Sequence, residues 1–492
     1  MAFLQQQPEQ LHHKNKQADT SLVPPVLISP HDTAAGNRTS SKIRKIDAYP
    51  GSLYDIDIID RLHNSIIGRF YVSHLKKYHI ARWIVRWIIA TWYSKIRPFC
   101  LIVRNSYRPR RYRTTKLREF IKEEGVSIYK LADEAFVEIP KPKVFPAHDQ
   151  GCMVKPHDHY KFPEIYIAII NNGIVNGGTN LITVDDQVVC HDLYDFDCDS
   201  TSEELHGRAL IDPKARRICW LLYDNKPGRI HAAASFVDAC AFNYAHWMTE
   251  VLPRINMFCA DKRFKDIPIV INDSLHDNIM ESLFLVAGTD REIIILPVGR
   301  ALRCNVLYVT SVTGYVPFGW RSEEFMPYSQ GMFSPQALHA LRSQILGLAQ
   351  NTKRHALPKK IFIRRNSANR KCENSVQIEK LLLDRDYVLV EPEKLTFLQQ
   401  VILFNNAQEI ISPSGAALAN VIFCKPGTRI VILMAKHQRM IYKYWSSMLA
   451  TFQLRFFYMF GNIINSDNLG IHSDFILDVS TFMDLLEELE RE

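Results

Sequence analysis

The segment from Phe242 to Arg254 places a histidine and a glutamate where they could share a proton. His246 and Glu250 are four residues apart, so on a helix their side chains lie on one face. A carboxylate beside an imidazole is one way to hold a general base near its working pKa. Pro253 should bend or end the helix, because proline has no backbone N–H to donate. The alternative interpretation is a core helix whose polar face is simply solvated.

A second stretch, residues 408–434, reads as a strand, a tight turn and the start of a helix. The turn and the first helical positions are Ser412, Ser414, Gly415, Ala416 and Ala417. Free backbone N–H groups and the helix dipole at such a turn attract an anion, and small side chains let it approach the backbone. An ordinary βαβ turn with a capping serine would give the same pattern.

A pair of arginines, Arg364 and Arg365, ends an apolar strand that begins at Lys360. Ligands of open α/β sheets bind at the carboxyl ends of the strands. Arginine is suited to bidentate contact with phosphate. We therefore expect a diphosphate to lie near Arg365, and an ordinary surface pair is the alternative.

Alternating strands and helices are expected to position these residues. The first series is predicted at strand 267–272, helix 275–287, strand 292–297 and strand 305–310, and a linking helix follows at 334–350. The second series is predicted at strand 360–365, helix 375–384, strand 387–391, helix 395–406 and the strand–turn–helix of 408–434. This alternation predicts an α/β fold with doubly wound parallel sheets and a ligand cleft between two consecutive halves.

The length of 492 residues is too great for one small core, so several domains are expected. In order, we predict a disordered polar tail over residues 1–50, a basic amphipathic helical region over 51–140, an N-terminal half over 141–333, a C-terminal half over 334–480 and an acidic helix end over 481–492. No apolar run follows Met1, and no stretch approaches the roughly 20 apolar residues of a spanning helix. A cytoplasmic protein with reduced cysteines is therefore expected.

The net charge of +8 hides a local concentration of positive charge. Residues 61–118 contain 15 lysines and arginines and no acidic residue. Within this stretch, apolar residues recur at helical spacing: Ile80, Trp83, Ile84, Trp87, Ile88 and Trp92. Such a helix suits an anionic membrane surface, although a helix packed on the protein's own core is the alternative. Nucleic acid is not predicted as a partner, because no recognised nucleic-acid motif accompanies the arginines.

Taken together, these motifs resemble glycosyltransferase family 61 over roughly residues 145–460. The family includes plant xylan arabinosyl- and xylosyltransferases and bacterial capsule-associated enzymes. The first signature is Asn243-x-x-His246-Trp247-x-x-Glu250-x-Leu252-Pro253-Arg254. The second is Ile363-x-Arg365 followed by Arg370, Asn374 and Glu379, and the third is Gly415-Ala416-Ala417-Leu418-x-Asn420 followed by Phe423, Pro426 and Gly427.

The resemblance implies a GT-B fold, with two Rossmann-like halves facing a cleft, and inverting, metal-independent transfer from a nucleotide sugar. The donor-binding residues that it implies are Arg365, Arg370, Asn374, Ser412, Ser414, Gly415, Ala416, Ala417 and Asn420. Glu250 is preferred as the base and His246 as its orienter, with the opposite assignment left open. Asn243 and Arg254 are expected to be positioning groups. No metal and no cofactor are predicted, because arginines would offset the charge of the departing diphosphate.

The expected partners are a nucleotide sugar, UDP-sugars foremost, and a glycan or lipid-linked glycan acceptor of capsular or cell-surface polysaccharide. With the basic region, this implies an enzyme peripheral to the inner face of the membrane. Two positions differ from the family pattern: Ser414 stands where histidine is usual, and Ile432 stands where an acidic residue is usual. They favour a second hypothesis, a non-catalytic nucleotide-sugar- or glycan-binding protein that keeps the GT-B shell.

Overall fold

The structure is a computed structural model. It describes residues 42–47, 80, 84, 87, 88, 91, 95, 111–152, 159–205, 208–220, 224, 226–317, 319–321, 330–350, 357–366, 370–437, 443–464 and 473–491. Most of the predicted polar tail and most of the predicted basic helical region therefore lie outside the described residues.

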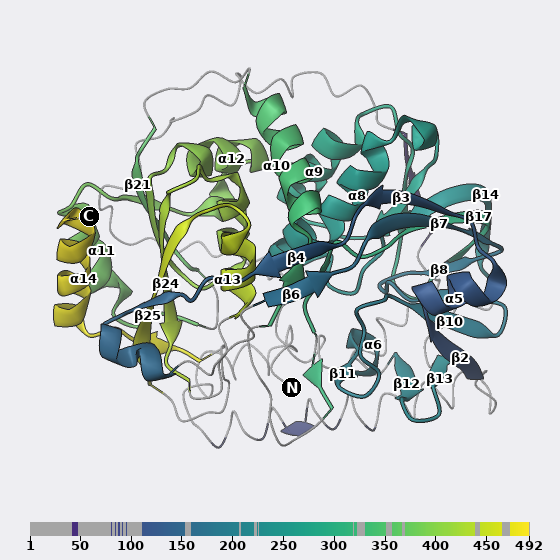
Figure 1. Ribbon diagram of the computed structural model, residues 1–492, viewed down its shortest axis with the longest axis horizontal. Helices are drawn as coiled ribbons and strands as arrows, with labels where there is room; N and C mark the ends of the chain where they lie inside the picture. Colours follow the sequence, from purple (N-terminus) through teal and green to yellow (C-terminus); the bar gives the residue numbers. More distant parts are fainter. Residues whose placement is uncertain are drawn as a thin grey trace.

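The larger of two main sheets occupies the right-hand part of Figure 1 and has 13 strands among the described residues. Its main path is, in spatial order, β1 (Ile43–Lys45), β16 (Ile293–Leu296), β15 (Ile269–Asn272), β14 (Gly228–Ser235), β17 (Ala301–Thr310), β8 (Ile174–Asn176), β9 (Ile182–Val184), β10 (Gln187–Cys190), β2 (Arg111–Lys116), β13 (Arg217–Trp220) and β12 (Ala209–Asp212). The strands from β1 to β17 are parallel. β7 (Ile165–Asn171) pairs antiparallel with β17, and β3 (Ile128–Ala132) pairs with β7.

The smaller sheet occupies the left-hand part of Figure 1. Its order is β22 (Val388–Val390), β21 (Lys360–Ile363), β23 (Glu409–Pro413), β24 (Arg429–Ala435), β25 (Arg455–Ile463) and β26 (Phe475–Ile476). The five strands from β22 to β25 are parallel. β5 (Lys143–Phe145), from much earlier in the chain, adds to this sheet in parallel beside β25.

Both faces of the smaller sheet are covered, and the side chains that alternate along its strands pack into a different apolar core on each face. On β24, Ile430 and Ile432 belong to one apolar core, whereas Val431 and Leu433 belong to another. The second core is closed by the outer helices α11 (Ser375–Leu383) and α14 (Val479–Arg491). Successive side chains of a strand point to opposite faces, so a continuous β-branched run is what a strand buried on both sides requires.

The first apolar core is shared by both sheets. It lies around a helical layer made by α8 (Leu252–Ala260), α9 (Asp277–Ala287), α10 (Pro335–Ala349) and α12 (Phe397–Asn406), which Figure 1 shows between the sheets. Ile269 of β15 and Ile410 of β23 belong to this one core, although they lie in different sheets. The predicted α/β fold is confirmed, and the predicted strands and helices of both series occur within a few residues of their expected places.

The prediction for the N-terminal segments needs correction where they are described. Residues 43–45, inside the predicted tail, form β1 beside β16. Residues 111–140, inside the predicted helical region, contain one helix, α5 (Leu117–Glu124), and three strands, β2, β3 and β4 (Ala135–Glu138). Thr114 and Thr115 are buried in β2, and such β-branched residues pack well in a sheet. Among the described residues, no helix has both the length and the apolar character needed to cross a bilayer.

The remaining described elements are short connections. They are η4 (Ala147–Cys152), the pair β4 and β6 (His159–Phe162), the pair β11 (Asp199–Ser200) and β19 (Gly319–Trp320), the pair β18 (Gly314–Tyr315) and β20 (Met332–Phe333), α6 (Ser202–Leu205), α7 (Tyr244–His246), η5 (Trp247–Val251), η6 (Lys262–Phe264), η7 (Pro392–Lys394), η8 (Ala416–Phe423) and α13 (Lys443–Ala450).

Candidate functional site

The helix predicted around His246 is continuous but contains one wide turn. Asn243 caps α7, because its side-chain oxygen accepts a hydrogen bond from the Ala245 N–H at 3.0 Å. The chain then forms a π-helical turn, η5, before α8 resumes with Pro253 in its first turn. Proline cannot donate a backbone hydrogen bond, so a change of hydrogen-bond register just before it is understandable. Single π-turns inside α-helices are frequent at functional sites.

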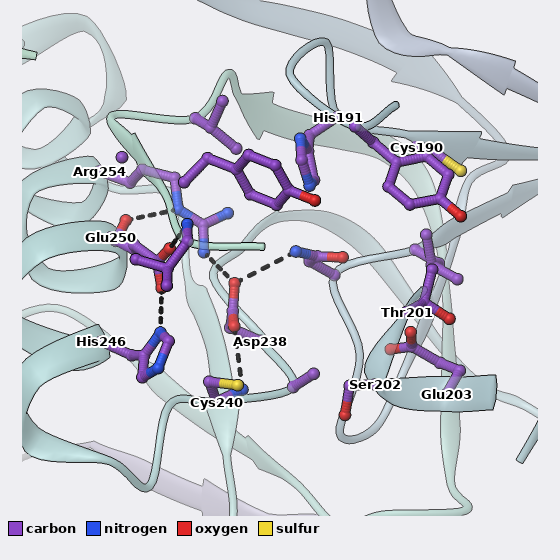
Figure 2. Close-up of a pocket in the computed structure, with 18 of the residues that line it drawn as sticks. Cys190, His191, Thr201, Ser202, Glu203, Asp238, Cys240, His246, Glu250 and Arg254 are labelled. Atoms are coloured by element: carbon purple, nitrogen blue, oxygen red, sulfur yellow. Dashed lines mark hydrogen bonds and ion pairs between the residues drawn. The ribbon is translucent and has the colours of Figure 1, made fainter. Parts of the chain in front are cut away.

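His246 and Glu250 form a close pair on this helix, as predicted from their spacing. Nδ1 of His246 donates to one carboxylate oxygen of Glu250 at 2.6 Å, and both side chains are buried. The other carboxylate oxygen accepts the Val316 N–H at 2.6 Å. Figure 2 shows the imidazole turned to Glu250 through this one nitrogen. The carboxylate is therefore held at both oxygens, and the imidazole at one nitrogen.

The environment of His246 favours its protonated form. Burial on its own would lower the pKa of His246, but the charge of Glu250 and the hydrogen bond to it outweigh burial and raise that pKa above its usual value. A neighbouring carboxylate acts in this way because it stabilises the imidazolium.

Arg254 helps to fix the backbone that carries Glu250. Its Nε donates to the backbone oxygen of Glu250 at 2.9 Å, and a terminal nitrogen forms an ion pair with Asp238 at 2.9 Å. Gly314 lies so close to the carbonyl of Thr249 that a Cβ there would clash with it. Absence of a side chain at Gly314 thus lets the segment carrying the Val316 N–H reach Glu250.

The turn predicted to bind an anion lies at the end of β23, but its two serine side chains already form hydrogen bonds within the protein. Ser412 donates to the Pro413 carbonyl at 2.8 Å, and Ser414 accepts from the indole N–H of Trp445 at 3.0 Å. The helix that follows, η8, is a 3₁₀-helix rather than the expected α-helix, and Ala416 and Ala417 stand at its start. Their partial exposure leaves this end of η8 open to a ligand.

Two arginines from the second signature gather next to this turn. The guanidinium of Arg365 lies against Gly415, where any Cβ would collide with it. Burial lowers the pKa of Arg365 to about 10, and burial together with the charge of Arg365 lowers the pKa of Arg370 to about 9. Arg370 also adopts a positive φ of 59°, which is uncommon for a residue with a long side chain. The Nε of Arg370 is buried and has no hydrogen-bond partner among the described residues.

Two other predicted donor-binding residues have structural partners instead. The side chain of Asn374 donates to the Leu477 carbonyl at 2.9 Å and accepts from the Leu477 N–H at 3.1 Å. Asn420, which is completely buried, donates to Gln400 at 2.8 Å and accepts from the Tyr244 hydroxyl at 2.6 Å. Arg364 is likewise paired, with Glu379 at 2.6 Å.

The structure brings the two predicted regions next to each other. α7 packs against η8, and the Tyr244–Asn420 hydrogen bond crosses between them. Burial raises the pKa of Tyr444, and the charges of Glu250 and Arg370 both act on it, in opposite directions. None of the described residues 412–417 lines the cavity beside His246.

That cavity, of about 70 Å³, is lined by described residues that all lie between Asn180 and Val316 in the sequence. One wall is formed by His246, Glu250 and Arg254, and the opposite wall by residues 200–203 and His191, as Figure 2 shows. The sequence did not predict the second wall. The one available signal was the position of His191 directly after the strand at 187–190, since side chains following strand ends often line sites.

The acidic run from Asp195 to Asp199 is used to build a turn. Asp195 accepts the backbone N–H groups of Asp197 and Cys198, and Asp199 accepts the hydroxyl of Tyr315 at 2.6 Å. Among the residues that the structure describes, no three His, Cys, Asp or Glu side chains are grouped so as to hold a metal ion. Metal independence itself remains a prediction.

Residues 244–431 match the family described as Glycosyltransferase 61. No curated protein matches the chain. The matched range runs from the start of α7 into β24, so it includes the His246–Glu250 pair, both arginines and the turn before η8.

Proposed function

Because residues 244–431 of this chain belong to glycosyltransferase family 61, we propose that the protein is an inverting, metal-independent glycosyltransferase. Its donor would be a nucleotide sugar, most simply a UDP-sugar, and its acceptor a glycan or lipid-linked glycan. We further propose that the two sheets correspond to the two halves of a GT-B fold, with the acceptor on the side of the larger sheet and the donor on the side of the smaller.

The observation that carries this proposal is the buried His246–Glu250 pair, with a separation of 2.6 Å. Both oxygens of Glu250 already accept hydrogen bonds, whereas His246 is bonded through Nδ1. This favours Nε2 of His246 as the base and Glu250 as the group that fixes its tautomer, which is the reverse of the assignment preferred from the sequence. A carboxylate that orients an imidazole in this way is a recurrent arrangement in acyl-transfer enzymes.

In the proposed reaction, the acceptor hydroxyl gives its proton to Nε2 of His246 as its oxygen bonds to the anomeric carbon. The bond from that carbon to the diphosphate oxygen breaks, and its electron pair leaves with the nucleotide diphosphate. Attack opposite the leaving group inverts the anomeric centre. A well-placed base contributes about 10²–10⁴-fold to the rate.

The proposed site for the diphosphate is formed by Arg365, Arg370 and the open start of η8 at Ala416 and Ala417. Burial and mutual repulsion lower the pKa of Arg370, so a bound anion would stabilise both guanidinium groups. Ser414 and Gly415 would shape this site through the backbone. Direct donor contacts are no longer proposed for Asn374 and Asn420, whose amides bind other parts of the protein.

The second candidate function is a non-catalytic protein that binds a nucleotide sugar or glycan. One observation favours it: Ser414, which replaces the usual histidine, is buried and bonded to Trp445. Ile432, which replaces the usual acidic residue, is completely buried in β24. Neither side chain could therefore contact a donor as the usual residues would.

The test is donor hydrolysis and transfer by the purified full-length protein, with a panel of UDP-sugars and with EDTA present. We expect product with EDTA, loss of product in His246→Ala, and a melting temperature that rises with nucleotide in both proteins. Activity that disappears with EDTA and returns with manganese would contradict the metal-free mechanism. Nucleotide binding without turnover on any donor would instead support the second candidate.

We propose that the protein acts at the inner, cytoplasmic face of a membrane, in capsular or cell-surface polysaccharide synthesis, through residues 61–118. Four apolar residues of this stretch, Ile80, Ile84, Trp87 and Ile88, are helical and exposed, which supports a surface-binding helix. We expect co-sedimentation with vesicles containing anionic lipid that weakens as salt is raised. Equal recovery on neutral vesicles would remove the electrostatic argument.

A further inference from the structure

The cavity wall opposite the His246–Glu250 pair contains polar atoms that the described protein does not satisfy. Glu203 and His191 both line this cavity, and Figure 2 shows them across it from His246. Oε1 of Glu203 and Nδ1 of His191 are buried, and neither has a hydrogen-bond partner among the residues that the structure describes. Buried polar atoms in native proteins are nearly always hydrogen-bonded, so two exceptions in one wall call for a specific explanation.

We propose that Glu203 and His191 bind the sugar ring of the acceptor, and that this ring is neutral and rich in hydroxyl groups. The proposal rests on the proposed function, because it places the acceptor between this wall and the base. Sugar hydroxyls would donate to the carboxylate of Glu203 and pair with Nδ1 of His191. One further hydroxyl would then face His246.

The charges around the cavity argue for a neutral rather than an acidic acceptor. Its lining includes three carboxylates, Glu203, Asp238 and Glu250, against one guanidinium, Arg254, and the imidazole of His246, so the carboxylates outnumber the cationic groups even when His246 is protonated. Arg254 is already paired with Asp238 at 2.9 Å. A uronic acid or phosphorylated sugar would therefore add a negative charge to a site with surplus negative charge, and like charges repel strongly where water is excluded.

The chemistry of His191 fits the same ligand. Burial lowers the pKa of His191 to about 3, so its ring is neutral at physiological pH. A neutral imidazole has one donor and one acceptor nitrogen, and this matches the hydroxyl group, which can also do both. An anionic ligand would gain more from a charged imidazolium, which this environment prevents.

The wall is held in place before any ligand arrives. Glu204 accepts the Thr201 N–H at 2.9 Å and binds Arg321 through both carboxylate oxygens at 2.8 Å. The ring of His191 lies 4.5 Å from the ring of Tyr315, centroid to centroid. A preformed wall does not have to be ordered on binding, which favours affinity for a small ligand.

A structural role for Glu203 is the competing explanation. Glu203 also lines a second cavity of about 10 Å³, together with Trp220, whose buried indole N–H has no partner within the described part of the chain. A single water molecule in that cavity could bridge the two side chains. Such a role predicts that Glu203 matters for stability and not for sugar binding.

The experiment compares Glu203→Gln, His191→Phe and the control Glu138→Gln in the full-length protein. Phenylalanine keeps a ring beside Tyr315 but removes both nitrogens, and Glu138 is exposed on β4, away from the cavity. The probes are the methyl glycosides of glucose, galactose and xylose, with glucuronic acid as the acidic sugar, measured by saturation-transfer NMR and titration. We expect a neutral glycoside to bind in preference to glucuronic acid, with affinity about 10- to 100-fold weaker in both cavity variants and unchanged in the control.

Melting temperature and donor hydrolysis separate the possible outcomes. Oε1 of Glu203 has no hydrogen-bond partner among the described residues, so Glu203→Gln should leave the melting temperature unchanged or higher, because natural proteins give up stability at functional sites. A clear drop in melting temperature with unchanged sugar binding would overturn the subsite in favour of the structural role. Absence of glycoside binding, or preference for glucuronic acid, would also overturn it.

The proposed function can fail independently of the subsite. If UDP-sugars are neither bound nor hydrolysed, yet a neutral glycoside binds in a Glu203-dependent way, the transferase proposal fails and the subsite stands. If UDP-sugars are hydrolysed and acceptor binding does not respond to Glu203 or His191, the subsite fails and the transferase proposal stands.

Discussion

The region around His246 and the region around Arg370 both contain buried charge, but they balance it differently. Glu250 is bonded at both oxygens, and Arg254 is paired with Asp238. Arg370 instead lies near a second guanidinium, that of Arg365, which lowers its pKa further. Glu250 and Arg254 are each compensated by partners within the described protein, whereas Arg370 would gain a balancing charge from a bound anion. This difference is what a fixed base and an anion-binding site would each require.

The largest expected effect is on the chemical step. His246→Ala should reduce transfer by about 10²–10⁴-fold, because it removes the proposed proton acceptor. The nucleotide-induced rise in melting temperature should remain, since the arginine region is untouched. Steady-state kinetics and thermal melting check this. Full transfer activity in His246→Ala would end the proposed role of the pair.

Replacing one arginine in the region around His246 and one in the region around Arg370 tests whether the two regions differ in charge balance. Arg254→Met leaves Asp238 buried without its cation and should cost about 3–5 kcal/mol of stability. Arg370→Met removes a repelled charge, so we expect it to change stability by less than about 1 kcal/mol while it weakens nucleotide binding. Chemical denaturation with and without UDP measures both. Equal destabilisation by the two substitutions would show that the regions do not differ in the way described.

The pH dependence tests the electrostatics of the pair. The raised pKa of His246 means that the base is unprotonated only at higher pH, so kcat/KM should rise with pH through a pKa above the usual histidine value. In Glu250→Gln the raising effect is lost while burial remains, so this limb should move to lower pH. In the folded protein the proton is bound more tightly than in the unfolded chain. The resulting stabilisation is complete below the unfolded pKa of about 6.5 and disappears as pH rises through the folded value.

The control for that measurement is an exposed histidine variant, His148→Gln, which should leave the pH profile unchanged because its side chain is largely in solvent. A profile in Glu250→Gln that coincides with the wild type would show that Glu250 does not set the pKa of His246.

The smallest expected effect concerns two glycines. In Gly415→Ala the new methyl group displaces the Arg365 guanidinium, so nucleotide affinity should fall by about tenfold. Because the clashing atom is the far end of a flexible side chain, stability should change by less than about 1 kcal/mol. The matched control is Gly347→Ala on α10, where no atom lies within 4 Å of the new methyl group. It should stabilise the helix by about 0.5–1 kcal/mol and leave nucleotide binding unchanged.

Local pattern was sufficient to predict the secondary structure of the two α/β series, but not that of the segments at residues 43–45 and 111–140 before them. The alternation of strands and helices from β15 to β24, and the His246–Glu250 pair on one helical face, follow from periodicity and spacing. The turn before η8 was also predicted. Its helix proved to be 3₁₀, which short helical segments rich in small residues do not reveal by pattern.

Long-range contacts could not be predicted in this way. The backbone N–H of Val316 donates a hydrogen bond to Glu250, which is 66 residues away in the sequence. The indole N–H of Trp445 donates to the hydroxyl of Ser414, which is 31 residues away. These partners support the proposed orienting role of Glu250 and bury Ser414, yet nothing in the spacing of either residue indicates them. The cavity wall at residues 200–203 runs from the end of β11 into α6, a four-residue helix whose sequence has no periodic signal.

The core that both sheets share has a practical consequence for dissecting the molecule. A gene divided in the segment between α10 and β21 would produce two polypeptides with large complementary apolar surfaces, and β5 would be separated from its neighbour β25. We expect each piece to aggregate when produced alone and the two to associate when produced together. Binding studies of the donor-side sheet therefore call for point variants of the intact chain rather than for truncated versions.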